Sequence, residues 1–135
     1  MSAASSDGPV GFTCQTFGSL SLDPLLVTFA AKSESRSWPL VRNARALGIN
    51  ILSSEQEALA RVFATSGIDK FEGVMWSRGP NGTPLLEGAL AHLEGVIEAV
   101  TTHGDHDVAV VRVEYALAHP GTPLIFYRGG FGFLD

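Results

Sequence analysis

Small polar side chains gather near the start of the chain. Thr13, Gln15 and Thr16 stand close together with Cys14 among them, and they precede the apolar run at residues 25–31. Small polar side chains beside backbone N–H groups suit a ligand that is rich in hydrogen-bonding edges and phosphate oxygens. The alternative is an ordinary β-hairpin, because turns also favour serine, glycine and aspartate.

A second cluster joins two cations to a hydroxyl group. Lys32, Arg36 and Ser37 follow one another closely, immediately before a predicted helix. Two cationic side chains, a hydroxyl group and a helix start can together form a cradle for a phosphate group. The alternative is a solvated surface loop, since exposed lysine and arginine are common.

The third cluster is the sequence GDH at residues 104–106, with His103 and Asp107 beside it. A histidine between carboxylates can bind a nucleotide or move a proton, because its charge changes near neutral pH. His106 is therefore a candidate site residue. The alternative is a polar hairpin tip that faces the solvent.

Other kinds of chemistry find no support in the residue pattern. One cysteine and four scattered histidines make neither an internal disulfide nor a zinc site, so no metal ligand is predicted. Cys14 has no evident base beside it, which favours a small buried side chain over a nucleophile. The sequence contains no GxGxxG or Walker motif and no catalytic triad. We therefore assign no catalytic residue and expect neither a Rossmann domain nor a P-loop.

Length and composition predict one cytoplasmic domain. The chain has 135 residues, of which 45% are hydrophobic and 17% charged, so it can bury a substantial core. The formal net charge of −5 argues against nucleic-acid and anionic membrane partners, and no apolar run approaches the roughly 20 residues that span a bilayer. The single cysteine and the lack of a signal peptide fit a reducing cytoplasm. Residues 1–9 are expected to be a flexible, frayed start before a single domain at residues 10–135.

Alternating and apolar runs predict about six strands and two short helices. Antiparallel strands with glycine-rich corners favour a mainly β fold, a small barrel. Ser37 is expected to cap a first helix that ends near Gly48, and a capping box of Ser54 and Glu57 is expected to start the second helix. The predicted strands span residues 10–17, 25–31, 49–52, 90–100, 108–117 and 123–127.

Seven segments in a fixed order resemble the flavin reductase family of split-barrel flavin-binding proteins. The similarity is greatest to the small reductase component of two-component aromatic monooxygenases. It implies a split β-barrel with two short helices, usually a homodimer. The segments are GFTCQTFGSLSLDP from residue 11, SRSW from residue 35, GINIL from residue 48, DKF from residue 69, PLLEGALAHLE from residue 84, GDH from residue 104 and PLIFYRG from residue 123.

The resemblance implies an activity and its partners. Such reductases take a hydride from NADH or NADPH and pass it to FMN or FAD, and the reduced flavin then leaves for a partner oxygenase. One alternative is a non-catalytic or truncated flavin-binding module that acts as an interaction subunit. Another is a related redox enzyme that uses a deazaflavin.

The resemblance also implies a role for each candidate residue. The flavin ring and ribityl chain are expected to lie against Thr13, Cys14, Gln15 and Thr16. The far side of the flavin and its phosphate are expected to lie against Ala30, Ala31, Lys32, Arg36 and Ser37. His106 is expected to hold the nicotinamide nucleotide, with Tyr127 and Arg128 at the border of that pocket.

The sequence departs from the family at its start. Family members usually begin with a helix and a first barrel strand, which residues 1–8 are too short to supply. From this we expect one of two things: a barrel that lacks an edge strand, with a perturbed homodimer, or a misassigned start of the gene.

Overall fold

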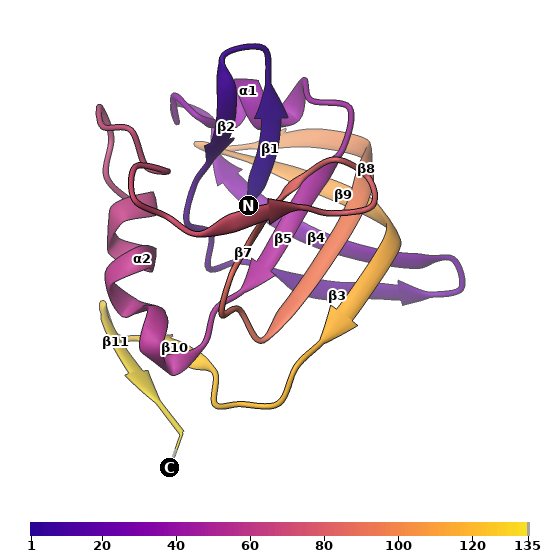
Figure 1. Ribbon diagram of the computed structural model, residues 1–135. Helices are drawn as coiled ribbons and strands as arrows, with labels where there is room; N and C mark the ends of the chain where they lie inside the picture. The colour runs from indigo at the N-terminus through magenta and orange to yellow at the C-terminus, as the bar shows by residue number, and fades with distance from the viewer. Residues whose placement is uncertain (135) are drawn as a thin grey trace.

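A seven-stranded antiparallel sheet forms the centre of the protein. The computed structural model describes residues 1–134, and its fold is mainly β with two short α-helices, as the sequence predicts (Figure 1). The strands are β1 (Ser2–Ser5), β2 (Gly8–Gly11), β3 (Gly18–Leu22), β4 (Leu25–Lys32), β5 (Leu47–Ile51), β6 (Trp76–Arg78), β7 (Pro84–Leu86), β8 (Ala91–His103), β9 (His106–Ala118), β10 (Leu124–Tyr127) and β11 (Gly130–Phe133). The helices are α1 (Trp38–Arg42), the 3-10 helix η1 (Ser54–Gln56) and α2 (Glu57–Phe63).

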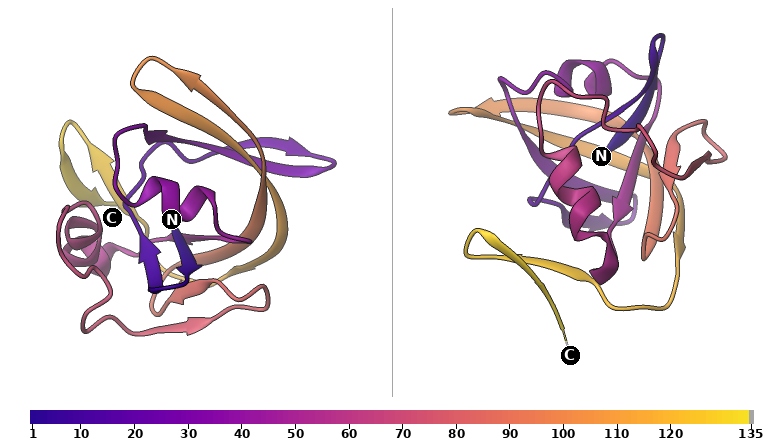
Figure 2. Two further views of the ribbon diagram at one scale, coloured as in Figure 1. Left: turned by 90° about the horizontal axis from the view of Figure 1, so that it is seen from above. Right: turned by 60° about the vertical axis from the view of Figure 1, so that its left-hand side comes forward.

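The strand order of the main sheet is β2-β1-β5-β8-β9-β4-β3, and the hairpins β6–β7 and β10–β11 lie outside it. β2 and β3, at the two ends of the order, do not pair with each other within the described residues, so the sheet is not closed as a barrel. Helix α1 lies near β1 and β2, while α2 and the β10–β11 hairpin lie on another side (Figure 2). The longest of these helices has seven residues, and none in the described part of the chain has the length and apolar character needed to cross a membrane.

The start of the chain is part of the sheet rather than frayed. β1 lies between β2 and β5, and Ser2 pairs with both Gly11 and Gly48. The polar side chain of Ser2 is fully buried because it is satisfied: Ser2 Oγ donates to the Pro84 carbonyl at 2.6 Å and accepts from Asn50 Nδ2 at 3.0 Å. The prediction of a frayed start was based on the polar composition of residues 1–9, and it does not hold for β1, which is paired on both sides within the sheet.

The predicted strand at residues 10–17 is also wrong, because most of this segment bonds outside a strand ladder. β2 ends at Gly11, and Thr13 N donates to the Phe63 carbonyl at 3.2 Å. Thr16 Oγ1 exchanges hydrogen bonds of 2.8 Å with the main-chain N–H and carbonyl of Ala30. The next strand is β3, which lies between the predicted strands at residues 10–17 and 25–31.

The other five predicted strands are confirmed, with shifted ends. The loop expected at residues 101–107 is nearly all strand, since β8 and β9 meet at a tight turn of two residues. The sequence missed β6, β7 and β11, which are short or rich in glycine. The capping box at the second helix is formed by Ser53 and Gln56 and not by Ser54 and Glu57. Ser37 precedes α1 but makes no side-chain capping bond.

The core has two parts. The larger one packs against the main sheet around Trp38, whose ring meets Phe12 and Phe29 edge-on at centroid distances of 6.2 and 5.6 Å. The smaller one joins α2 to the segment before β6 through Phe63 and Phe71, at 4.9 Å between centroids. The segment at residues 12–16 touches both parts, because Phe12 belongs to the larger one and Thr13 N donates to the main-chain oxygen of Phe63 in the smaller one.

We expect Gly95→Ala to destabilise the protein by about 1–3 kcal/mol. Gly95 lies at a bulge of β8, where a Cβ atom would collide with the main-chain oxygen of Arg112 and lie 2.7 Å from a methyl group of Val111. Urea unfolding measures the loss. The matched control is Gly18→Ala on the edge strand β3, where the new Cβ would have only one neighbour, at 4.0 Å. Equal stability of the two variants would contradict this account of the bulge.

Candidate functional site

Two cavities share the segment at residues 12–15 in their walls. The first, which we call the polar cavity, has a volume of about 720 Å³. It brings together nine of the twelve residues predicted from the sequence. These are Thr13, Cys14, Gln15, Thr16, Ala30, Ala31, Lys32, Arg36 and His106.

The remaining three predicted residues lie outside this cavity. Ser37 follows Arg36 in the sequence but does not line the cavity itself. Its hydroxyl accepts a hydrogen bond from Lys70, which does line the cavity. Tyr127 and Arg128 line neither cavity: the Tyr127 side chain is 72% exposed, and Arg128 forms the tight turn between β10 and β11 with φ of 51°. The structure thus does not bring Tyr127 and Arg128 to the predicted pocket.

The polar cavity carries positive charge on a chain that is acidic as a whole. Lys32, Arg36 and Lys70 line it against a single carboxylate, that of Glu34. Lys32 ends β4 and is paired across the sheet with His106, the first residue of β9. Cationic side chains converging on one cavity attract an anionic ligand. Lys32 and Arg36 of the expected phosphate cradle thus line one cavity, and Lys70 lies there with them.

Lys70 is the site residue that the assignments from sequence missed. Its Nζ donates to the Gly11 carbonyl at 3.1 Å and to Ser37 Oγ at 3.2 Å, so it links two distant segments beside the cavity. Burial lowers the pKa of the Lys70 ammonium from its usual value. The DKF segment at residues 69–71 was the available signal, but nothing in its local pattern shows which way the lysine points.

His106 is held by one of its two neighbouring carboxylates. Asp105 Oδ1 lies 2.7 Å from His106 Nδ1, and this hydrogen bond and the histidine's charge lower the pKa of Asp105. The other ring nitrogen has no hydrogen bond within the described residues, so it is available to a ligand. Asp107, the second carboxylate, binds other residues and does not face His106.

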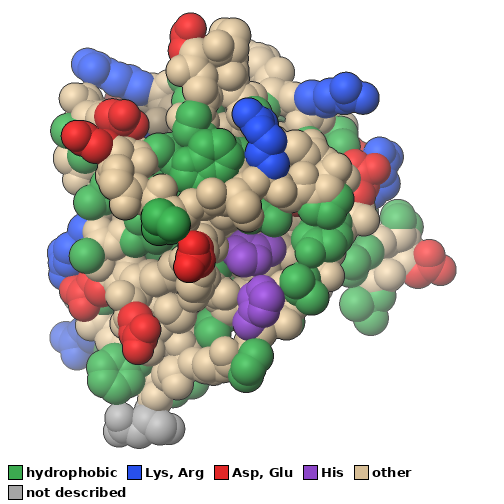
Figure 3. Space-filling model, viewed as in Figure 1, with side chains coloured by type: hydrophobic (Ala, Val, Ile, Leu, Met, Phe, Trp, Pro, Cys, Tyr) green, Lys and Arg blue, Asp and Glu red, His purple; other side chains and the backbone are tan. Residues whose placement is uncertain are grey.

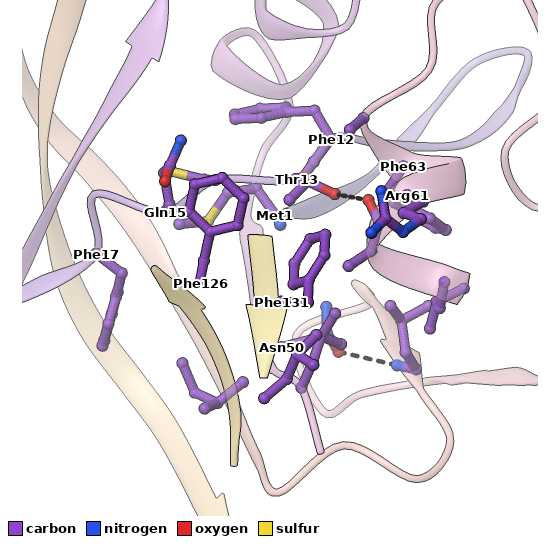
Figure 4. A pocket seen from close by; sticks show the side chains of 18 of the residues that line it. Met1, Phe12, Thr13, Gln15, Phe17, Asn50, Arg61, Phe63, Phe126 and Phe131 are labelled. Carbon is purple, nitrogen blue, oxygen red and sulfur yellow. Dashed lines mark hydrogen bonds between the residues drawn. The ribbon is translucent and has the colours of Figure 1, made fainter. Parts of the chain in front are cut away.

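The second cavity, which we call the aromatic cavity, has a volume of about 770 Å³. Phe17, Phe126 and Phe131 lie around it, and Thr13 Oγ1 donates across its edge to the Ala60 carbonyl at 2.6 Å (Figure 4). The Arg61 guanidinium lies 5.0 Å from the centre of the Phe131 ring. Thr13, Cys14 and Gln15 are the predicted site residues that also line this cavity. Its aromatic walls suit a flat ring system.

The residues present fit a flavin nucleotide. The polar cavity offers cations for a phosphate group, the shared segment offers the Thr13 hydroxyl and main-chain groups for the polar edge of a ring, and the aromatic cavity offers flat apolar walls. No cluster of side chains in the described part of the chain could hold a metal ion.

The fold is mainly β, and a cationic cavity beside an aromatic one suits a nucleotide as ligand. The chain belongs to the flavin reductase family, because the family model described as "Flavin reductase like domain" matches residues 1–135. The resemblance drawn from the sequence is thereby confirmed.

Individual relatives agree with this assignment. The chain is 41% identical over 124 residues to the reductase subunit HsaB of a flavin-dependent monooxygenase from Rhodococcus jostii, a match that covers 91% of this chain and 64% of that protein. The chain thus spans just under two thirds of that relative. The name of this relative agrees with the family assignment.

Two solved structures share the fold over almost the whole chain. Nitrilotriacetate monooxygenase component B from Mycobacterium thermoresistibile has a TM-score of 0.95 at 35% identity, with 99% of this chain and 76% of that chain covered. The NADH:FAD oxidoreductase SgcE6 from Streptomyces globisporus, in complex with NAD and FAD fragments, has a TM-score of 0.93 at 31% identity, with 99% and 82% covered.

Proposed function

We propose that this protein is an NAD(P)H-dependent flavin reductase that passes a hydride from NADH or NADPH to FMN or FAD. The observation that carries the proposal is the cationic polar cavity, which contains nine of the predicted site residues and adjoins an aromatic cavity of similar size. The names of the Rhodococcus and Streptomyces relatives support the same reaction. The reduced flavin would then serve a flavin-dependent oxygenase as the second component.

The proposed roles follow the two cavities. Lys32, Arg36 and Lys70 bind the phosphate of the flavin nucleotide, while Ser37 holds Lys70 in place. The segment at residues 13–16, together with Ala30 and Ala31, lies against the flavin ring and ribityl chain. The bound flavin supplies the redox chemistry, since its ring accepts a hydride. The protein's own part is to orient two ring systems and exclude water, which needs no strong acid or base.

The test is NADH oxidation by the purified protein, followed by the loss of nicotinamide absorbance with and without added FMN or FAD. Oxidation that requires flavin is the expected result. Flavin binding by fluorescence without oxidation would favour the non-catalytic module, and tight binding of a deazaflavin alone would favour the related redox enzyme. Absence of both oxidation and flavin binding would overturn the proposal.

We expect His106→Ala to raise the KM for NADH by about tenfold while flavin affinity stays nearly unchanged. His106 lines the polar cavity beside Lys32 and keeps one ring nitrogen free, so it can bind a second nucleotide next to the flavin. Steady-state kinetics with NADH as the varied substrate measure the change. The control is His103→Ala, three residues earlier in the same hairpin and outside both cavities. An unchanged KM in the His106 variant would remove this residue from the site.

We also propose that the protein forms a homodimer. The β3–β4 hairpin projects from the body of the molecule and exposes apolar side chains, with Leu22 exposed by 85% and Leu20 by 53% (Figure 3). β3 is an unpaired edge of the sheet within the described residues, which adds main-chain groups to this surface. Light scattering measures the mass in solution, and a strictly monomeric protein would contradict the proposal.

We further propose that the open sheet is a split barrel. We also propose that the protein is located in the cytoplasm. The bulges of β8, at Glu94/Gly95 and Ile97/Ala99, bend the sheet, which supports the barrel. Cys14 is a free thiol, which supports a reducing compartment. An experimental structure and cell fractionation test these two points.

A further inference from the structure

We propose that Asp107 is a positioning residue for the phosphate-binding loop at residues 33–37, because its carboxylate fixes both ends of that loop. The proposal rests on the proposed function, which gives the loop a flavin phosphate as its ligand. Asp107 lines neither cavity and is only 7% exposed. It therefore acts through the residues it holds and not by contact with a ligand.

The start of the loop is fixed by two hydrogen bonds to the β8–β9 hairpin. Ser33 Oγ donates to Asp107 Oδ1 at 3.1 Å, and Ser33 N donates to the main-chain oxygen of Asp105 at 2.9 Å. Ser33 directly follows Lys32, which is paired with His106 across the sheet. A substitution of Asp107 can remove the bond from Ser33 Oγ but not the main-chain bond to Asp105.

The end of the loop is fixed by the other oxygen of the same carboxylate. Trp38 Nε1 donates to Asp107 Oδ2 at 2.8 Å, and Trp38 is the first residue of α1. The Trp38 ring is buried in the core, so the indole N–H has one fixed direction. The loop at residues 33–37 is therefore fixed at both ends by hydrogen bonds to the Asp107 carboxylate, from Ser33 at its start and from Trp38 directly after its end.

Two further contacts hold the carboxylate itself. Thr102 Oγ1 donates to Asp107 Oδ1 at 2.8 Å from the neighbouring strand, and Arg42 Nη1 lies 3.7 Å from Oδ2. Hydrogen bonds from Trp38 and Thr102 are the main reasons why the pKa of Asp107 lies below its usual value. The carboxylate stays ionised, which strengthens each bond that it accepts.

The loop between these anchors supplies three residues of the polar cavity, Glu34, Ser35 and Arg36. A five-residue segment with loose ends would sample many positions, and binding would have to order it at a cost in affinity. The loss of affinity should therefore affect ligands whose phosphate group contacts the loop. Riboflavin has the ring and ribityl chain of FMN without the phosphate, so it separates the two effects.

The experiment measures dissociation constants for FMN and riboflavin by fluorescence quenching, for the wild type and for Asp107→Ala. We expect Asp107→Ala to reduce the preference for FMN over riboflavin by about tenfold. Asp107→Asn should restore most of that preference, because the amide can keep Trp38 on its oxygen while the two hydroxyl groups accept from its nitrogen. Trp38→Phe removes the anchor at the end of the loop while it keeps an aromatic ring in the core, and it should lower the preference in the same direction even if Asp107→Ala fails to fold.

The matched control is Glu94→Ala, which truncates another buried carboxylate. Glu94 accepts from Thr83 Oγ1 at 2.7 Å and from Asn81 N at 3.1 Å, and it lines neither cavity. An unchanged preference in Trp38→Phe and in folded Asp107→Ala would overturn the proposal, as would an equal loss in Glu94→Ala. If the wild-type protein bound neither FMN nor riboflavin, the proposed function itself would be wrong. If the wild type bound FMN but the Asp107 and Trp38 variants kept the same preference, only the role proposed for Asp107 would be wrong.

Discussion

Lys70→Met should weaken FMN binding by about 10- to 100-fold and leave riboflavin binding nearly unchanged. The Lys70 ammonium group uses two of its three hydrogens on Gly11 and Ser37, which leaves the third for a ligand phosphate in the polar cavity. Methionine keeps most of the apolar stem and removes the charge. Titration of both flavins by fluorescence measures the ratio.

The lowered pKa of Lys70 adds a pH dependence to this expectation. A phosphate beside the ammonium group favours its charged form, so binding of FMN should raise that pKa again. FMN affinity should then fall as the pH rises through the pKa of Lys70 in the free protein, whereas riboflavin affinity should not.

The control for Lys70→Met is Arg78→Met in the β6–β7 hairpin, which removes one cation outside both cavities. Equal losses for FMN in the two variants would show that only net charge matters.

Trp38→Ala should lower the free energy of unfolding by about 3–5 kcal/mol. The Trp38 ring is 2% exposed and packs edge-on against Phe12 and Phe29 in the larger part of the core. Alanine would leave a cavity at the point where α1, the sheet and the segment at residues 12–16 meet. Urea unfolding, with the slope of the transition checked for a two-state process, measures the loss.

A neighbour in the same helix gives the control for that measurement. Leu40 is 49% exposed on α1, so Leu40→Ala should change the free energy of unfolding by only about 0.5 kcal/mol. Similar losses in Trp38→Ala and Leu40→Ala would mean that α1 contributes through its helical backbone and not through the tryptophan ring.

The sequence predicts the fold where a pattern is strong and local. The apolar run of β4 and the long alternating runs of β8 and β9 are found close to their predicted places. The start of the chain is different because its stability comes from partners far along the sequence. Ser2 is satisfied by Asn50 and Pro84, and no local pattern announces such partners.

The candidate site divides in the same way. Local clusters identify Lys32, Arg36 and His106, and the structure brings these to one cavity. Lys70 and the aromatic cavity depend on how α2 and the C-terminal hairpin lie against the sheet, which sequence spacing does not encode. Tyr127 was assigned from the resemblance alone, and in the structure its side chain faces solvent.

The tight β8–β9 hairpin has a consequence for the order in which the protein folds. Its two strands of 13 residues each are joined by a two-residue turn, so their pairing closes only a small loop and costs little chain entropy. β5 and β4 add to the two edges of this hairpin by closing much longer loops. We expect the contacts that close these long loops to form after those of the hairpin. The cradle built from Lys32 and His106 needs the pairing of β4 with β9, so we expect the capacity to bind an anion to arise after the hairpin has formed its own hydrogen bonds.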